Sequence, residues 1–477
     1  MKTLLKTLAC AVAMAACTAH GVNVVGSTGD IATGEAWGGS VPTSDIARFN
    51  TSSGKYTAEA DVTLGSVQIS QNTTFNLDTS GNHTIKTSKF YFGWYQRTVN
   101  INGGIWDLSG TLSSDTTAAP DHYFATCNGN GAVHTITATL SKGCIVTNAT
   151  SLRVGYNSNK NQLKITDSSR IYVNGSANLW INHTAINGLL EMSSGGQLDV
   201  TGTLYDGYAN TQVRADTTNS IVVTGNGSKL TSIMLYIGSH FGRNSLLVSD
   251  GGELSVPTRF ILGNSANGNT NSAVFETGAK FLMRDIRTGE GGSCGNALKF
   301  LSGASGTIEA GGRIGGWDTP GSDNTMLVSN ATVSVTGILA FGVPKGDASG
   351  ISGNGLIIQG ATPSLDCTSN ILVKNRSFLR IEVPAGGYAD GFTPLSASSV
   401  TFDDTSAFEI VVPDASGMPD SQRLISTTGG ITISDAVLGA AKSSVSAQSN
   451  GKLRLVKADG GKAIDLKVVK GLVIMFN

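Results

Sequence analysis

The sequence has little charge and little proline. Charged residues make up 14% of the chain, and 10 of its 477 residues are proline, whereas about 25% charge is usual. An ordinary apolar content with so little charge excludes an intrinsically disordered chain. Scarce proline without a Gly-x-y period excludes collagen. A coiled coil would draw about half of its residues from Ala, Glu, Lys, Leu and Arg, which this chain does not.

Neither sign of charge dominates, and long hydrophobic runs are missing. The 33 basic residues nearly balance the 34 acidic residues, so there is no electrostatic reason to expect nucleic acid or an anionic membrane as the main partner. Beyond the first 20 residues no segment reaches 18 consecutive apolar residues. The mature chain is therefore expected to have no transmembrane helix.

The first 19 residues have the pattern of a secretory signal peptide. Lys2 and Lys6 precede a short apolar stretch, residues 8–16, and Cys17-Thr18-Ala19 supplies small residues for cleavage. The alternative is a lipoprotein signal acylated at Cys17, because residues 14–17 read Met-Ala-Ala-Cys. We expect an exported protein, outside the cell or on its outer surface, with the periplasm as a further possibility.

Glycine is abundant, with 61 residues, and it marks a repeat. A short apolar motif ending in glycine returns every 25 to 32 residues between Gly93 and Gly342. Its clearest copies end at Gly93, Gly155, Gly238, Gly263 and Gly342. After each mark an asparagine opens the next strand, as at Asn161, Asn219, Asn244, Asn271, Asn296, Asn324 and Asn354. The variable distance between the two signals places insertions in one loop per repeat, as in solenoid proteins.

Between these marks the chain alternates apolar and polar residues, as in residues 253–256 and 332–335, which predicts half-buried strands. A repeat of about 26 residues with three short strands cannot bury its apolar faces alone. Stacked coils solve this, so we predict an all-β, single-stranded parallel β-helix, right-handed as is most common. The asparagine side chains are expected to bond from coil to coil. A β-propeller would need about 40–50 residues per blade.

The repeat divides the chain into four segments. We expect the signal peptide at 1–19, an N-terminal cap with the first coils at 20–89, the β-helix at 90–383, and a β-rich C-terminal cap at 384–477. Within this last cap, strands are expected at residues 452–456, 464–469 and 472–476, the first two around an Asp459-Gly460-Gly461 turn. A cap protects the open strand edges at the end of a solenoid.

Four cysteines follow the signal segment: Cys127, Cys144, Cys294 and Cys367. A disulfide needs Cα atoms within about 7 Å, and the coil geometry places these residues on different faces or several coils apart. We therefore predict four unpaired, mostly buried thiols.

The runs 223–230, 235–238 and 244–252 closely resemble the repeat shared by type V secretion (autotransporter) passengers and PEP-CTERM-type surface proteins. Residues 37–42 and 45–49 are similar to the N-terminal motif of such proteins. The resemblance implies an exported bacterial β-helical protein and brings no catalytic residues with it. Neither the translocator barrel nor the Pro-Glu-Pro sorting signal of these families is seen in the sequence.

Acidic and basic residues gather over neighbouring repeats between positions 284 and 313. The group contains Arg284, Asp285, Arg287, Glu290, Glu309 and Arg313. Paired carboxylates are what glycoside hydrolysis requires, so this group is the candidate site of a polysaccharide lyase or glycosidase. Surface ion pairs on a solvated face explain the same pattern and are the favoured interpretation.

The remaining candidates are weaker. Trp94, Tyr95 and Trp317 suit sugar stacking or, preferably, packing at the base of loops. Asp403-Asp404 and the glycine-rich run 289–295 are interpreted as turns. The histidines are scattered without metal-ligand spacing, namely His83, His122, His134, His183 and His240. The sequence therefore assigns no catalytic residue, no metal and no cofactor.

These observations favour a non-enzymatic, adhesin-like or structural surface protein. Its faces and loops would bind an extracellular polysaccharide or another cell-surface ligand. The alternative is a carbohydrate-active β-helix enzyme that uses the residues near 284–313.

Overall fold

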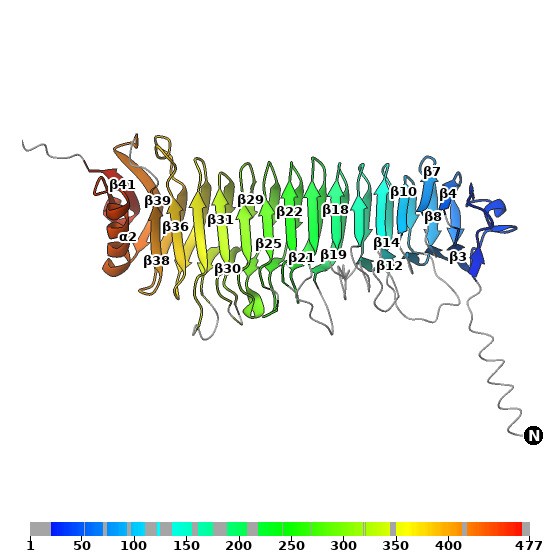
Figure 1. Cartoon of the computed structure of the whole chain (residues 1–477), viewed down its shortest axis with the longest axis horizontal. Helices are drawn as coiled ribbons and strands as arrows, with labels where there is room; N and C mark the ends of the chain where they lie inside the picture. Colours follow the sequence, from blue (N-terminus) through cyan, green and yellow to red (C-terminus); the bar gives the residue numbers. More distant parts are fainter. Residues whose placement is uncertain are drawn as a thin grey trace, which may run out of the picture.

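The computed structural model describes residues 21–51, 53–69, 74–92, 97–109, 122–124, 136–154, 161–174, 188–207, 218–240, 242–267, 269–317, 319, 321–343, 350–412 and 417–469. The molecule is a long straight rod whose strands run across its long axis (Figure 1). The first described coils lie at one end of the rod, and the helix α2 (Asp435–Gln448) lies at the other end.

Each coil contributes strands to three faces. Face 1 is a 15-stranded sheet in which every pair is parallel and each strand pairs with its equivalent one coil later. Its strands are β2 (Thr28–Asp30), β4 (Ser53–Ala58), β7 (Thr74–Thr79), β10 (Arg97–Asn102), β13 (Ile136–Ser141), β16 (Gln162–Ile165), β18 (Leu189–Ser193), β20 (Ser220–Thr224), β22 (Ser245–Ser249), β25 (Ser272–Phe275), β28 (Ala297–Phe300), β31 (Thr325–Ser329), β34 (Gly355–Gln359), β36 (Phe378–Glu382) and β38 (Ala407–Val411).

Face 2 follows face 1 in each coil. It contains β5 (Val62–Leu64), β8 (Thr84–Thr87), β11 (Ile105–Asp107), β14 (Ile145–Ala149), β17 (Arg170–Val173), β23 (Glu253–Val256), β26 (Lys280–Met283), β29 (Ser305–Ile308) and β32 (Thr332–Val335). Five long strands begin on face 2 and continue onto face 3: β19 (Gln197–Asp206), β21 (Lys229–Ile237), β35 (Ser364–Val373), β37 (Leu395–Phe402) and β39 (Ser421–Thr432).

Face 3 closes each coil. Its separate strands are β1 (Gly21–Asn23), β3 (Ile46–Phe49), β6 (Ser66–Ile69), β9 (Phe90–Phe92), β12 (His122–Phe124), β15 (Leu152–Val154), β24 (Arg259–Leu262), β27 (Ile286–Thr288), β30 (Gly311–Ile314) and β33 (Ile338–Phe341). A short 3-10 turn, η1 (Gly34–Trp37), lies near the first coils, and a second, η2 (Glu290–Gly292), follows β27.

The strands alternate buried and partly exposed residues, so one side of every strand enters a continuous core. Aligned residues of successive coils stack inside it, as the rings of Phe275 and Phe300 do at 5.2 Å and 22°. The ring of Phe281, from face 2, packs across the core at 4.6 Å from that of Phe300. Since apolar surface is buried between coils and not within one, no repeat is stable alone. The predicted all-β parallel β-helix is confirmed.

Glycine occupies the corner after face 3 because the backbone there is left-handed. Gly238, Gly263 and Gly342 have φ of 74°, 76° and 64°, a conformation that costs other residues energy. A Cβ on Gly238 would lie 2.3 Å from the side chain of Asn271. The three glycines align along one edge as the repeat predicts, while Gly93 and Gly155 lie outside the described residues.

The asparagines that follow this corner form a buried ladder. The backbone N–H of Asn271 and its side-chain Nδ2 both donate to Oδ1 of Asn296, at 3.0 and 2.9 Å. Asn296 repeats both bonds to Asn324 at 3.1 and 2.7 Å, and Asn244 bonds to Asn271 in the same way. Each amide satisfies groups that burial would otherwise leave unpaired, so the predicted bonding from coil to coil is confirmed.

The parallel coils continue beyond residue 383, where the sequence predicts the cap to begin. Strand β36 pairs in parallel with β38, and β37 with β39, so the coils extend to Thr432. The asparagine signal stops earlier because Ser377 and Ser406 occupy the ladder position of these last coils. Buried serine fills the same place with a shorter side chain.

The C-terminal cap is a hairpin and a helix. Strands β40 (Leu453–Ala458) and β41 (Ala463–Val468) pair antiparallel around η3 (Asp459–Gly461), as predicted, and β41 also pairs antiparallel with β39. The helix α2 was not predicted. Its Gln448 donates to the carbonyl of Ile410 and accepts from the N–H of Val412, both at 2.9 Å. These bonds occupy backbone groups at the open edge of β38. The strand predicted at residues 472–476 lies outside the described residues.

Three of the four cysteines fall within the described residues, and all three are free thiols. Cys144 and Cys367 are buried and Cys294 is partly exposed, which confirms the prediction for these three. Cys127, like the signal segment, is outside the described residues.

Candidate functional site

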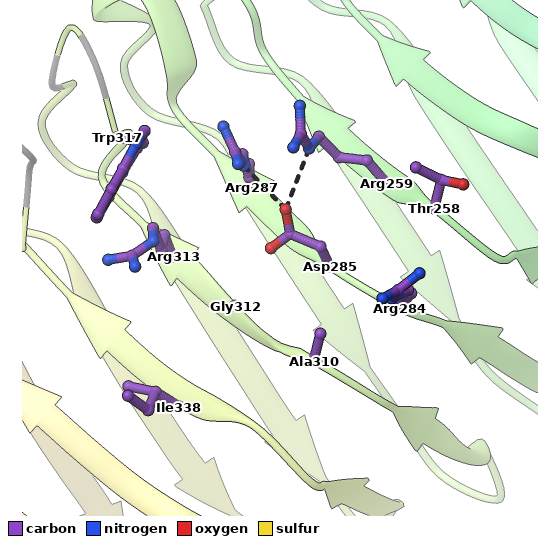
Figure 2. A pocket seen from close by; sticks show the side chains of 10 residues that line it. All are labelled: Thr258, Arg259, Arg284, Asp285, Arg287, Ala310, Gly312, Arg313, Trp317 and Ile338. Atoms are coloured by element: carbon purple, nitrogen blue, oxygen red, sulfur yellow. Dashed lines mark hydrogen bonds and ion pairs between the residues drawn. The ribbon is translucent and has the colours of Figure 1, made fainter.

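A groove of about 470 Å³ lies where faces 2 and 3 meet, on the coils of β24, β27 and β30 (Figure 2). The register aligns Arg287 with Arg313 on neighbouring strands, both facing outward. Arg259 and Asp285 enter from the start of β24 and from the residue before β27. Ala310 brings only a small side chain to the lining. The structure thus brings Arg284, Asp285, Arg287 and Arg313 together as the sequence predicts.

Arg287 joins the two carboxylates of the site. Its Nε lies 3.0 Å from Oδ2 of Asp285, and its Nη1 lies 3.3 Å from Oε1 of Glu290. Oδ2 of Asp285 also accepts from Nε of Arg259 at 3.1 Å. The other oxygen of Glu290 accepts from the backbone N–H of Trp317 at 3.2 Å. Both carboxylates are therefore already engaged by donors of the protein.

Arg313 differs from Arg259 and Arg287 because no carboxylate within the described residues is in ion-pair contact with it. Its guanidinium carbon lies 3.5 Å from the centre of the Trp317 ring, which is a close cation–π contact. Burial lowers the pKa of Arg313, although Asp285 and Glu290 oppose the shift and Arg287 adds to it. Figure 2 shows the Arg313 side chain beside the Trp317 ring, and a half-buried cation held in this way is suited to binding an anion.

Two tyrosines extend the outward row of the site along face 3. The row runs through Tyr205, Tyr236, Ile261, Arg287 and Arg313, which pair in register on successive coils. The rings of Tyr205 and Tyr236 stack 4.7 Å apart at 27°. Desolvation raises the pKa of Tyr236, and the neighbouring Tyr205 adds to the shift, while Arg259 and Arg287 oppose it.

Three residues of the site were not identified from the sequence, namely Tyr205, Tyr236 and Arg259. The two tyrosines and Arg287 each stand two residues before the glycine that ends the face 3 motif. Aligning the repeats on that glycine would have found the row. Arg259 had no such signal, because its part in the site depends on its contact with Asp285.

The other candidates lie elsewhere. Glu309 is exposed and does not line the groove. His83 lies 3.6 Å from Asp61 on another coil, and His240 is on a corner, where burial lowers its pKa. The side chain of His122 and the whole of Trp94, Tyr95, His134 and His183 lie outside the described residues. No cluster of three metal-ligating side chains occurs within the part of the chain that the structure describes.

Asp403 stabilises a turn, as predicted. Its carboxylate accepts from the backbone N–H groups of Asn375, Thr405 and Ser406 at 2.7, 3.0 and 2.9 Å. Burial alone would raise its pKa, but these hydrogen bonds outweigh burial and lower it. The run 289–295 is likewise a turn, built around η2.

Among the described residues, no helix is long and apolar enough to cross a membrane. Comparisons with protein-family models, with curated proteins and with solved structures give no significant match.

Proposed function

We propose that the protein is an exported, non-enzymatic β-solenoid that binds an anionic extracellular polysaccharide in the groove of face 3. The observation that carries the proposal is Arg313, stacked on Trp317 beside Arg287 and without a carboxylate partner among the described residues. Four arginines meet two carboxylates in this groove and its floor, in a chain whose net charge is −1. The local positive charge is therefore a feature of the site and not of the whole protein.

Acidic sugars fit this chemistry. A uronate carboxylate accepts two parallel hydrogen bonds from a guanidinium group, and sugar rings can pack on the partly exposed rings of Tyr205 and Tyr236. The coils are about 4.8 Å apart, so the row presents its side chains at short, regular intervals to an extended chain. The secretory pattern of residues 1–19 supports a partner outside the cell.

An enzyme is the second candidate, because the groove region does contain two carboxylates, Asp285 and Glu290. Hydrolysis needs them on opposite sides of the scissile bond, one as an acid and one as a base or nucleophile. Here Arg287 bridges both from one side chain, and each also accepts a second donor. In this arrangement the two carboxylates balance the charge of Arg287, which favours a structural role over a catalytic role for them.

The test measures binding of polygalacturonate and of neutral dextran to the wild type and to Arg313→Ala and Trp317→Ala variants by isothermal titration calorimetry. We expect the wild type to bind the acidic polymer, and each variant to bind it at least about tenfold more weakly. Arg170→Ala is the matched control, because Arg170 lies 4.3 Å over Tyr172 on face 2. It should leave the affinity unchanged.

Two results would contradict the proposal. The first is equal affinity for the neutral and the acidic polymer, or an affinity that both groove variants retain. The second is release of reducing ends or unsaturated uronates from the polymer, with loss of this release in an Asp285→Asn variant, which would establish the enzyme.

A further inference from the structure

The outer side of face 1 carries an apolar row with charges at both ends. The register aligns ten outward, partly exposed residues on successive coils from β16 to β38. In order they are Lys164, Glu191, Val222, Leu247, Val274, Lys299, Leu327, Ile357, Arg380 and Glu409. On a sheet with one solvated face, the residues that point to solvent are usually polar. The aliphatic residues in the middle of this outward row therefore need an explanation.

The neighbouring outward row is made of small residues. Two positions earlier on the same strands stand Ser220, Ser245, Ser272, Ala297, Thr325 and Gly355, flanked by Leu189 and Phe378 and, on the outermost coils, by Gln162 and Ala407. The strands stay nearly parallel along the rod (Figure 1). Small side chains on an untwisted sheet make a flat surface, which a second flat sheet can approach closely.

The charged ends of the row are complementary to each other in reverse order. Lys164 lies 3.3 Å from Glu191 at one end, and Arg380 lies 2.7 Å from Glu409 at the other. Read from the β16 end the order is positive then negative, and read from the β38 end it is negative then positive. A two-fold axis between β25 and β28, parallel to the strands, would therefore place opposite charges face to face.

We propose that face 1 binds a second copy of this chain, with the two rods antiparallel. Lys164 then faces Glu409 of the second copy, and Glu191 faces its Arg380. Between these charge clusters Val222 faces the second copy's Ile357, and Leu247 faces its Leu327. In the flanking row, Leu189 meets the second copy's Phe378. Val274 faces the second copy's Lys299, whose aliphatic stem packs along apolar surface while its ammonium reaches solvent at the edge.

The charges favour this alignment of the two rods over alignments that are shifted by one or two coils. A shift by one coil in one direction brings Lys164 opposite Arg380. A shift in the other direction brings Glu191 opposite Glu409. Both shifts place like charges together, which disfavours association, and a shift by two coils would bury Glu191 against Leu327 without a counter-charge.

The surface is large enough for a specific dimer. Nine steps of about 4.8 Å give a length of about 43 Å, and the three outward residues of a five-residue strand such as β20, namely Ser220, Val222 and Thr224, span a width of about 14 Å. The projected area is thus roughly 600 Å² per copy, or about 1,200 Å² in total, at the lower bound of stable interfaces.

The test is sedimentation equilibrium of the full chain with two charge reversals. The one-end reversal, Lys164→Glu with Glu191→Lys, keeps the pair within the chain but places like charges across the interface. The two-end reversal adds Arg380→Glu with Glu409→Arg and restores complementarity. We expect a wild-type dimer, a dissociation constant raised at least about tenfold by the one-end reversal, and recovery in the two-end reversal.

Two further variants keep the result unambiguous. Arg170→Asp with Asp199→Arg reverses an ion pair of 2.7 Å on face 2 and should leave the dimer unchanged. Leu247→Glu places an unpaired charge in the apolar row and should abolish the dimer while the circular dichroism spectrum stays that of the folded chain. A wild type that is monomeric up to about 100 µM, or a dimer that neither Leu247→Glu nor the one-end reversal weakens, would overturn the proposal.

Discussion

Asp206 is a carboxyl group in a position that the repeat reserves for apolar residues. It faces the core at the end of β19, aligned with Ile237 of the next coil, and it is fully buried. Neither carboxyl oxygen makes a well-formed hydrogen bond within the described residues, although the side chain of Asn219 lies close enough to lower the pKa slightly. Burial dominates and raises the pKa of Asp206 well above its ordinary value of 3.8.

This position predicts that an Asp206→Asn variant is more stable than the wild type at neutral pH. A raised pKa means that the folded chain keeps a proton which the unfolded chain releases. The stabilisation from that proton is complete below the unfolded pKa near 3.8 and is lost as the pH rises toward the folded pKa. The loss is about 1.4 kcal/mol for each pH unit in that window. The Asp206→Asn variant has no titrating group at this position. The excess of its free energy of unfolding over that of the wild type should therefore grow with pH at the same rate.

The assay compares the free energies of unfolding of wild type and variant between pH 4 and pH 8. Taking the difference at each pH removes the contributions of all other titrating groups. Asp366→Asn is the control for the exchange itself, because Asp366 is exposed on β35. A flat difference for Asp206→Asn, or an advantage that grows toward acid pH, would refute the assignment of a buried, proton-retaining carboxyl group.

Three further predictions follow from the corner, the thiols and the groove. Gly238→Ala should lower the free energy of unfolding by about 1–3 kcal/mol, measured by denaturant titration, because φ is 74° and the new Cβ would meet Asn271; an unchanged midpoint would contradict it. In the folded protein a thiol reagent should modify Cys294 but not Cys144, whose pKa burial raises to about 12; equal modification rates, resolved by peptide mass analysis, would contradict it. Affinity for acidic oligosaccharides should rise with their length until they span about 20 Å, the distance from Tyr205 to Arg313 over four coils; a monosaccharide that binds as tightly as the polymer would exclude the row as the binding surface.

The fold was predictable because its two sequence signals are parts of one contact. The left-handed backbone at Gly238 leaves the space that the side chain of Asn271 fills, so neither residue tolerates a change without the other being affected. A signal of this kind returns once per coil and reveals both the period and the corner. Where other residues make this contact, the sequence signal of glycine and asparagine disappears although the coil remains. This happens at Ser377 and Ser406, and it is why the β-helix is longer than the sequence predicts.

The helix α2 shows a different limit. Its buried residues Val437, Leu438, Ala441 and Val445 form one stripe with helical spacing, and Ser434 caps its N-terminus. Much of the remaining helix is serine and alanine, a composition that also suits the loops of this chain. Its role is settled by tertiary structure, since Gln448 reaches the open edge of β38.

The candidate site was predicted in part, and the reason lies in the backbone. Strand β21 runs without interruption from face 2 to face 3. On the next coil Pro257 and Thr258 separate β23 from β24, since proline has no N–H to continue a ladder. Two-residue breaks follow on the next three coils, at residues 284–285, 309–310 and 336–337, and β35 is continuous again. The groove lies along these breaks, with Thr258, Arg284 and Ala310 in its lining.

This coincidence explains how a regular solenoid acquires a local site. The inward residues beside the breaks, Phe260, Ile286 and Ile308, keep the core continuous, so the stacking of coils does not depend on the outward side chains. The outward side chains at a break are no longer held at the spacing of one unbroken strand, and arginines from three coils converge on Asp285 and Trp317. Sequence periodicity reports the inward residues, which repeat. Periodicity does not identify the outward residues of the site, because their role depends on which neighbouring side chains the break brings together.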